Sequence, residues 1–332
     1  MPTLPNYIAS NLDDSISEYL TGTGSSVPGW VLPGATVDLD FANGRYFGGT
    51  LTSLLSITRA SNATDLLPSS ASGYAYNTFS SNILAISPTF GLLIFEARTN
   101  LLLNSNAPAT QTTASLGTGT YTLWCNGSGS VLASGGTATI TGAAPATNGS
   151  PNTFTVTVAG TVTATVTGLL NAFQLESGAF GTSFIVTAGA TATRAADSVT
   201  TSGAFVLTTS GSIIAQTSGV TSFGGVRAMY ASVGSVGLFY NGNQVTSFTP
   251  SLTAVGTVTL ANLNKCGFSW NASGRSLVFN NGTLVSDATA STGTIPAGIG
   301  GSAGSFPLDG VISRLTAWNT RLPDATLKAN TA

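Results

Sequence analysis

Short segments in which apolar and polar residues alternate run through much of the chain. The alternation has period two, the spacing of a β-strand with one buried face. It is clear in TVDLDF at residues 36–41 and recurs at residues 120–125, 138–140, 153–158 and 161–166. Turn-favouring pairs separate the later segments, at Asn126–Gly127, Gly135–Gly136, Asn148–Gly149 and Ala159–Gly160. Short strands joined by tight turns predict an antiparallel, jelly-roll-like β-sandwich.

A second series of alternating segments occupies the C-terminal part of the chain. It comprises residues 204–208, 212–216, 228–233, 236–240, 244–248 and 266–271. Asn-Gly at 241–242 and at 281–282 lies between alternating apolar residues, which is the strongest short-range signal for a β-hairpin. Residues 310–316 are expected to form a further strand, and residues 323–329 a short helix. These patterns predict a second β-sandwich, so the fold class is all-β.

The first residues of the chain follow a different pattern. In SNLDDSISEYL, residues 10–20, the apolar positions fall near helical spacing, and the Gly-, Ser- and Pro-rich residues 21–34 are typical of a linker. We therefore predict three parts: an N-terminal arm at 1–34, one sandwich at 35–200 and another at 201–332. The arm contains three of the acidic residues and is a candidate attachment segment, or a helix that packs on the first sandwich.

The longest nearly unbroken apolar segment, GLLIFEARTNLLL at residues 91–103, contains Glu96 and Arg98. Charges in apolar sequence are costly to bury unless they are paired. Two further arginines stand in TRA contexts, and two further acids lie near apolar residues. We expect this set to form structural ion pairs where the ends of the first sandwich meet: Arg59, Glu96, Arg98, Glu176, Arg194 and Asp197. A ligand-binding or catalytic pair at Glu96 and Arg98 is the alternative.

Charge is scarce and has no basic excess. Only 7% of residues are charged, the net charge is −2, and the pI is about 4.9. These values argue against nucleic-acid binding, which needs clustered Lys and Arg. No charged residue occurs from Thr99 to Leu175. Such strands lack the charges that protect exposed sheet edges, so we expect sister subunits to cover much of this surface.

The sequence lacks residues on which several common kinds of catalytic and metal-binding site depend. The chain has no histidine and two cysteines, Cys125 and Cys266, which we expect to be free buried thiols. We predict no catalytic residue, no metal site and no cofactor. A pair of acids could still hydrolyse glycosides, with Asp38 and Asp40, or Glu96 and Glu176, as candidates. No apolar run is long enough for a membrane span, and no signal peptide is evident.

Three motifs in order resemble a family of phage virion proteins of the head-spike and tail-fibre type. They are SITRAS at 56–61, GLLIFEARTNLLLNS from residue 91, and QLESGAFGTSFIVT followed by TRAAD at 174–197. The resemblance covers about residues 36–200. It implies a virion surface protein with a β-sandwich and no known enzyme activity. Because Thr-rich strands are common in trimeric phage fibres, we expect a homo-oligomer, a homotrimer first.

The C-terminal part resembles the laminin-G and concanavalin-A-like sandwiches. The resemblance lies in two segments, FSWNASGRSLVFNNGTLVSDA and LDGVISRLTAWNTRLPDATLKA. The resemblance covers about residues 203–330 and implies a lectin-like or interaction module. Tyr230, Tyr240, Asn241 and Asn243 lie at or beside a hairpin tip, and we expect them to contact a glycan.

The sequence thus favours a phage virion structural protein: a head-spike, head-fibre or tail-fibre subunit on the virion surface. We expect it to adhere to a host cell-surface polysaccharide and to contact other virion proteins through residues 1–34. Capsid decoration without a ligand and a glycan depolymerase are the alternative functions.

Overall fold

The computed structural model describes residues 27–67, 76–202, 205, 207, 209–218, 226–232, 236–241, 244–247, 252–254, 263–291, 297–301 and 307–332. The chain divides into two units, residues 1–33 and 34–332. The division lies close to the end of the predicted arm. The helix expected at residues 10–20 falls outside the described residues.

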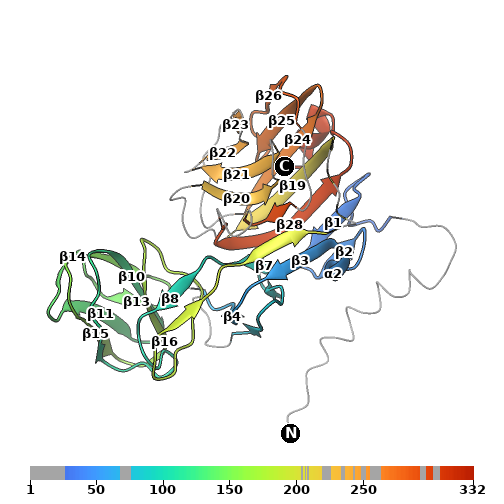
Figure 1. Cartoon of the computed structure of the whole chain (residues 1–332). Helices are drawn as coiled ribbons and strands as arrows, with labels where there is room; N and C mark the ends of the chain where they lie inside the picture. The colour runs from blue at the N-terminus through green and yellow to red at the C-terminus, as the bar shows by residue number, and fades with distance from the viewer. Residues whose placement is uncertain are drawn as a thin grey trace, which may run out of the picture. The chain divides into compact units, whose positions relative to one another are not determined.

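The second unit is built from antiparallel β-sheets, and the all-β prediction is confirmed. Two of the sheets form a large sandwich (Figure 1). Within the residues that the structure describes, one sheet has nine strands: β1 (Val37–Asp40), β2 (Arg45–Phe47), β6 (Ile86–Ser87), β7 (Gly91–Ile94), β19 (Gly211–Ser218), β24 (Asn264–Asn271), β25 (Gly274–Phe279), β26 (Val285–Asp287) and β28 (Gly310–Trp318). The other has seven: β3 (Leu55–Thr58), β18 (Ser198–Thr201), β20 (Val226–Ala231), β21 (Gly237–Asn241), β22 (Gln244–Ser247), β23 (Leu252–Ala254) and β27 (Gly298–Ile299). Apolar side chains from both sheets fill the space between them, among them Leu39, Ile213, Leu238, Trp270 and Leu315.

Strands from both ends of the second unit share these sheets. β1 pairs with β28, where Leu39 lies opposite Leu315, and β28 also pairs with β7. Figure 1 shows the blue β1 beside the red β28. In the second sheet β3 pairs with β18. The expected division at residue 200 therefore does not separate two sandwiches, because strands before residue 95 complete the sheets of the C-terminal part.

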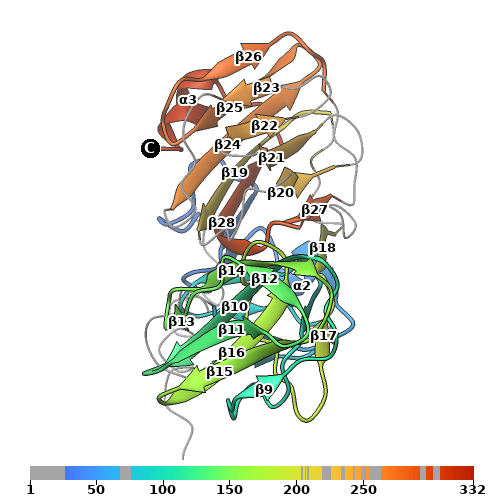
Figure 2. The same cartoon turned by 90° about the vertical axis from the view of Figure 1, so that its left-hand side faces the viewer.

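A smaller sandwich is inserted between β7 and β18, and we call residues 101–189 the inserted sandwich (Figure 2). One sheet contains β10 (Gly119–Gly127), β12 (Thr139–Thr141), β14 (Asn152–Val158) and β16 (Leu170–Ser177). The other contains β9 (Gln111–Thr112), β11 (Ser130–Gly135), β13 (Ala146–Thr147) and β15 (Val162–Thr167). Successive strands alternate between the two sheets, so each connection crosses an end of the sandwich. Its own core includes Leu123, Val131, Phe154, Phe173 and Leu175.

The chain enters and leaves the inserted sandwich side by side. β8 (Arg98–Asn100) and β17 (Ala192–Arg194) form a two-stranded ladder in which Arg98 lies opposite Arg194. The remaining elements are short: β4 (Ala63–Thr64), β5 (Thr78–Phe79), α2 (Leu51–Leu54) and α3 (Asp324–Ala329). α3 falls within the C-terminal helix expected from sequence.

Both hairpins signalled by Asn-Gly are present. Asn241 pairs with Gln244 across the first turn, and Leu277 pairs with Val285 across the second. In the second turn Asn280 and Asn281 have φ values of 45° and 54°, a left-handed conformation that asparagine tolerates better than most residues. This local chemistry explains why the hairpins could be predicted.

Candidate functional sites

The ladder of β8 and β17 gathers the six residues for which ion pairs were expected. Arg59 Nη1 lies 2.8 Å from Asp197 Oδ1, and both side chains are fully buried. Arg98 pairs with Glu96, and its Nε lies 3.8 Å from Glu176 Oε2. These contacts place the charged set at the junction between the two sandwiches.

Arg194 completes this junction through oxygen acceptors and an aromatic ring. Its Nη1 donates to the Ser183 carbonyl at 2.8 Å and to the Ser183 hydroxyl at 2.6 Å. Its Nη2 donates to the Glu96 carbonyl at 3.0 Å, and its guanidinium carbon lies 4.7 Å from the centre of the Phe95 ring. Arg194 therefore joins the inserted sandwich to the end of β7.

Sequence reasoning missed Arg227, which comes from β20 of the large sandwich. Its Nη1 lies 2.7 Å from Glu96 Oε2 and donates to the Pro307 carbonyl at 3.0 Å. Arg98 and Arg227 both face the Phe180 ring, at 4.7 and 5.4 Å from its centre. Nothing in the local sequence of Arg227 marks this role, because its partners are far away in the chain.

Glu176 is fully buried and held by uncharged donors as well as by Arg98. Its carboxylate accepts from the Thr182 backbone and hydroxyl, both at 2.7 Å, and from Gln174 Nε2 at 3.0 Å. Burial raises the pKa of Glu176, and these hydrogen bonds oppose the rise. Burial likewise raises the pKa of Asp197, against the effect of Arg59. The contacts are those of a structural network.

Asp38 and Asp40 are also held by structural partners. Asp38 is fully buried, and Arg314 donates to both of its carboxylate oxygens, at 2.8 and 2.6 Å. Asp40 accepts from Asn43 Nδ2 at 2.9 Å and from Arg45. The two carboxylates thus bind separate arginines.

The structure contradicts two of the four predicted glycan contacts, those of Tyr230 and Tyr240. Tyr230 and Tyr240 are 1% and 0% exposed and belong to the core of the large sandwich. The Tyr240 hydroxyl bonds the Thr217 hydroxyl and lies 3.6 Å from Cys266 Sγ. Both tyrosines lie on inward-facing strand positions, so neither can reach a glycan. Asn241 is exposed, and Asn243 lies outside the described residues.

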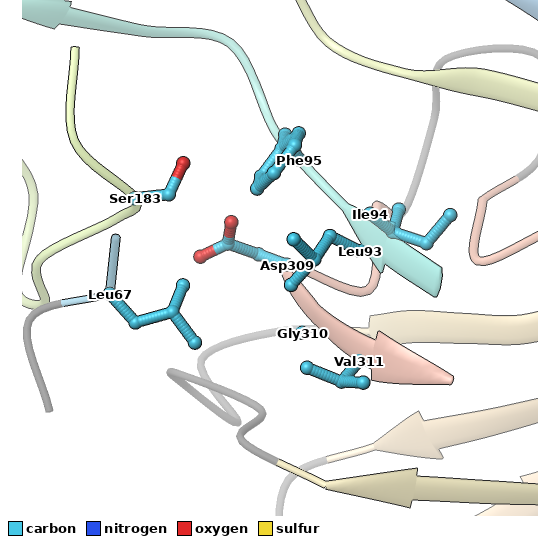
Figure 3. A pocket seen from close by; sticks show the side chains of 8 residues that line it. All are labelled: Leu67, Leu93, Ile94, Phe95, Ser183, Asp309, Gly310 and Val311. Carbon is cyan, nitrogen blue, oxygen red and sulfur yellow. The ribbon is translucent and has the colours of Figure 1, made fainter. Parts of the chain in front are cut away.

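Figure 3 shows a small cavity where the end of β7 meets the start of β28. Asp309 and Ser183 are its polar lining residues, with Leu67, Leu93, Phe95 and Val311 among the apolar ones. Its volume is about 10 Å³, near the least that holds one water molecule. The cavity is too small for a saccharide or a cofactor.

An open hollow of about 420 Å³ lies at one end of the inserted sandwich. Three strand connections meet there: β10 to β11, β13 to β14 and β15 to β16. We call it the asparagine hollow, and its lining residues are Asn126, Gly127, Ser128, Asn148, Leu169 and Asn171. Its volume lies within the roughly 300–1,000 Å³ that is common for ligand sites.

The three asparagine side chains of the hollow form a chain of hydrogen bonds. Asn126 is buried, and its Nδ2 donates to Asn148 Oδ1 at 3.1 Å. Asn171 is exposed, and its Nδ2 donates to Asn126 Oδ1 at 3.3 Å. Beside them Leu169 is 79% exposed, although it is a large apolar residue. The hollow therefore presents oriented amide groups next to an apolar side chain.

Two glycines allow the strand connections around the hollow to approach one another closely. A Cβ on Gly127, where φ is 134°, would lie 2.5 Å from the Leu169 carbonyl oxygen, and one on Gly129 would lie 2.2 Å from the Thr167 carbonyl oxygen. The Asn-Gly pairs at 126–127 and 148–149 predicted two of these turns. That they converge with the turn after β15 depends on the sheet order, which the sequence pattern does not reveal.

The described residues contain neither a cluster of metal-ligating side chains nor a helix suited to cross a membrane. No group of three or more His, Cys, Asp or Glu side chains there is placed to hold a metal ion. Among the helices that the structure describes, none has the length and apolar character that crossing a bilayer requires. Cys125 and Cys266 are both free and buried, as predicted.

Comparisons with known proteins give structural likenesses at low similarity. The sequence matches no protein-family model and no curated protein. The CBM40 of the Ruminococcus gnavus IT-sialidase bound to alpha2,3 sialyllactose is similar at 18% identity and a TM-score of 0.32, over 38% of this chain and 84% of that one. The leech intramolecular trans-sialidase gives 16% identity and a TM-score of 0.32, over 38% of this chain and 23% of that one. The Trypanosoma rangeli sialidase gives 15% and 0.29, over 37% of this chain and 22% of that one. TM-scores this low do not bear on the ligand of this chain.

Proposed function

We propose that the protein is a non-catalytic adhesin subunit on the surface of a phage virion and that it binds a host glycan in the asparagine hollow. The observation that carries the proposal is the convergence of three strand connections on one open hollow lined by hydrogen-bonded amides. Connections at one end of a rigid sandwich are a common location for binding residues. Amides both donate and accept hydrogen bonds, as sugar hydroxyls do.

The virion part of the proposal rests on the resemblance of three motifs to those of head-spike and tail-fibre proteins. Residues 1–34 would attach the subunit to other virion proteins, and a homotrimer would present several hollows together. Such multivalency raises the avidity of weak individual sites without any new contact. The uncharged strands of the inserted sandwich suit burial against sister subunits.

A glycan array tests the adhesin. The full chain, coupled to beads at high density, is applied to immobilised bacterial surface polysaccharides. We expect binding to a subset of them, and its loss in an Asn148→Ala/Asn171→Ala double variant that keeps the wild-type melting temperature. Absence of binding at high avidity would favour a decoration protein without a ligand. Reducing ends that accumulate when the bound polysaccharide is incubated with the protein would contradict the non-catalytic assignment.

A further inference from the structure

We infer that the asparagine hollow selects uncharged saccharides over acidic ones, an inference that rests on the proposed glycan binding. The first reason is the composition of the hollow. None of its six lining residues carries a charge, and they belong to the stretch from Thr99 to Leu175 that has no charged residue at all. A sugar carboxylate held there would have no cation to pair with.

The second reason is where the protein uses its arginines. All eight are engaged with acceptors of the protein itself, seven of them in ion pairs with its acids and Arg194 with Ser183 and Glu96. Of the seven ion-paired side chains, only Arg45 is more than a third exposed. The arginines therefore serve folding, and none of them is among the residues that line the hollow.

The third reason is the match between the hollow and a sugar ring. Asn171 uses one amide N–H in the bond to Asn126, and its amide has a second N–H and an oxygen with which to meet hydroxyl groups. Leu169 offers an apolar surface to the C–H face of a ring. An ionised carboxylate would lose hydration without a compensating charge-assisted bond, which penalises acidic sugars.

The test compares matched saccharides that differ only in charge. The chain of 332 residues, held on a biosensor, is exposed to neutral oligosaccharides ending in galactose or N-acetylhexosamine and to their sialylated and uronic-acid counterparts. We expect the neutral member of a pair to bind about tenfold more tightly, the effect of one unfavourable desolvated charge. We also expect affinity to change less than about twofold between 0.05 and 0.5 M NaCl, because salt screens only charged contacts.

Variants assign the binding to the hollow. Asn171→Ala and Leu169→Ser should each weaken binding of the neutral saccharide about fivefold or more, with unchanged melting temperature, since both side chains are exposed. Asn241→Ala, an exposed asparagine at the first hairpin, is the matched control and should bind as wild type. Loss of binding in Asn241→Ala alone would move the site to that hairpin and overturn the assignment.

The outcomes separate the two proposals. Tighter binding of the acidic member, or affinity that falls steeply with salt, overturns the selectivity while glycan binding stands. Failure of every saccharide in both series to bind overturns glycan binding in the hollow, and the selectivity with it.

Discussion

Arg98 contacts residues from separate segments of the chain, so its replacement should remove several stabilising contacts at once. It pairs with Glu96 and Glu176, donates to the Ser177 carbonyl at 2.6 Å and faces the Phe180 ring. Arg98→Ala should lower the free energy of unfolding by about 3 kcal/mol, toward the lower end for a broken buried ion pair, because Glu96 keeps its bond to Arg227. Urea denaturation of the variant and the wild type measures this change in the free energy of unfolding.

The control is an arginine whose ion pair reaches solvent. Arg45 pairs with Asp40, its side chain is 44% exposed, and Asn43 still bonds Asp40 when Arg45 is absent. Arg45→Ala should therefore cost less than about 1 kcal/mol. Equal losses in the two variants would mean that the junction contributes no more than a surface ion pair.

Because of Glu176, the stability of the folded protein should fall as pH rises. Its pKa is raised by burial from an ordinary value of 4.5, so the folded state takes up a proton more readily than the unfolded state. Its contribution to stability is then full below pH 4.5 and is lost as pH rises through the folded pKa. The melting temperature should rise as pH is lowered from 7 toward 5. Glu176→Gln should flatten this part of the profile, and an unchanged slope in that variant would assign the dependence to another group such as Asp197.

At the scale of strands, the features that follow from neighbours in sequence could be predicted. The hairpins at Asn241 and Asn281, the strand β1 and the terminal helix α3 each rest on a few adjacent residues. The pairing of β1 with β28 has no such signal, because Leu39 and Leu315 are brought together only by the complete sheet. The same limit explains why the expected boundary at residue 200 was wrong.

Single turns of the asparagine hollow could be predicted from the sequence, but the hollow as a whole could not. The turns at Asn126 and Asn148 were expected, but the hollow they form with Leu169 depends on which connections share an end of the sandwich. Tyr240 shows the opposite error. Its place beside a hairpin tip suggested exposure, whereas its side chain faces inward with that of Leu238, into the core.

At the scale of the whole molecule, the shared sheets predict which pieces of the chain fold alone. A fragment of residues 201–332 lacks β1, β3, β7 and β18, and with them the core side chains of Leu39, Leu55 and Ile94. It would expose sheet edges and leave the core incomplete, so we expect it to aggregate or remain unfolded. A fragment of residues 100–190, which includes the whole inserted sandwich, contains its own core cluster and should fold by itself.

Both fragments can be compared with residues 34–332 by thermal melts in circular dichroism and by the dispersion of amide signals in nuclear magnetic resonance. Residues 100–190 should unfold cooperatively, at a lower temperature than the longer chain, because they lose the packing of Leu66 and Tyr76 against Trp124 and Phe184. Cooperative unfolding of residues 201–332 alone would show that the N-terminal strands are dispensable additions to the large sandwich. We expect residues 201–332 to fail to fold and the inserted sandwich to fold. The large sandwich is discontinuous in sequence, so its two halves meet only when the chain on both sides of the insertion is present.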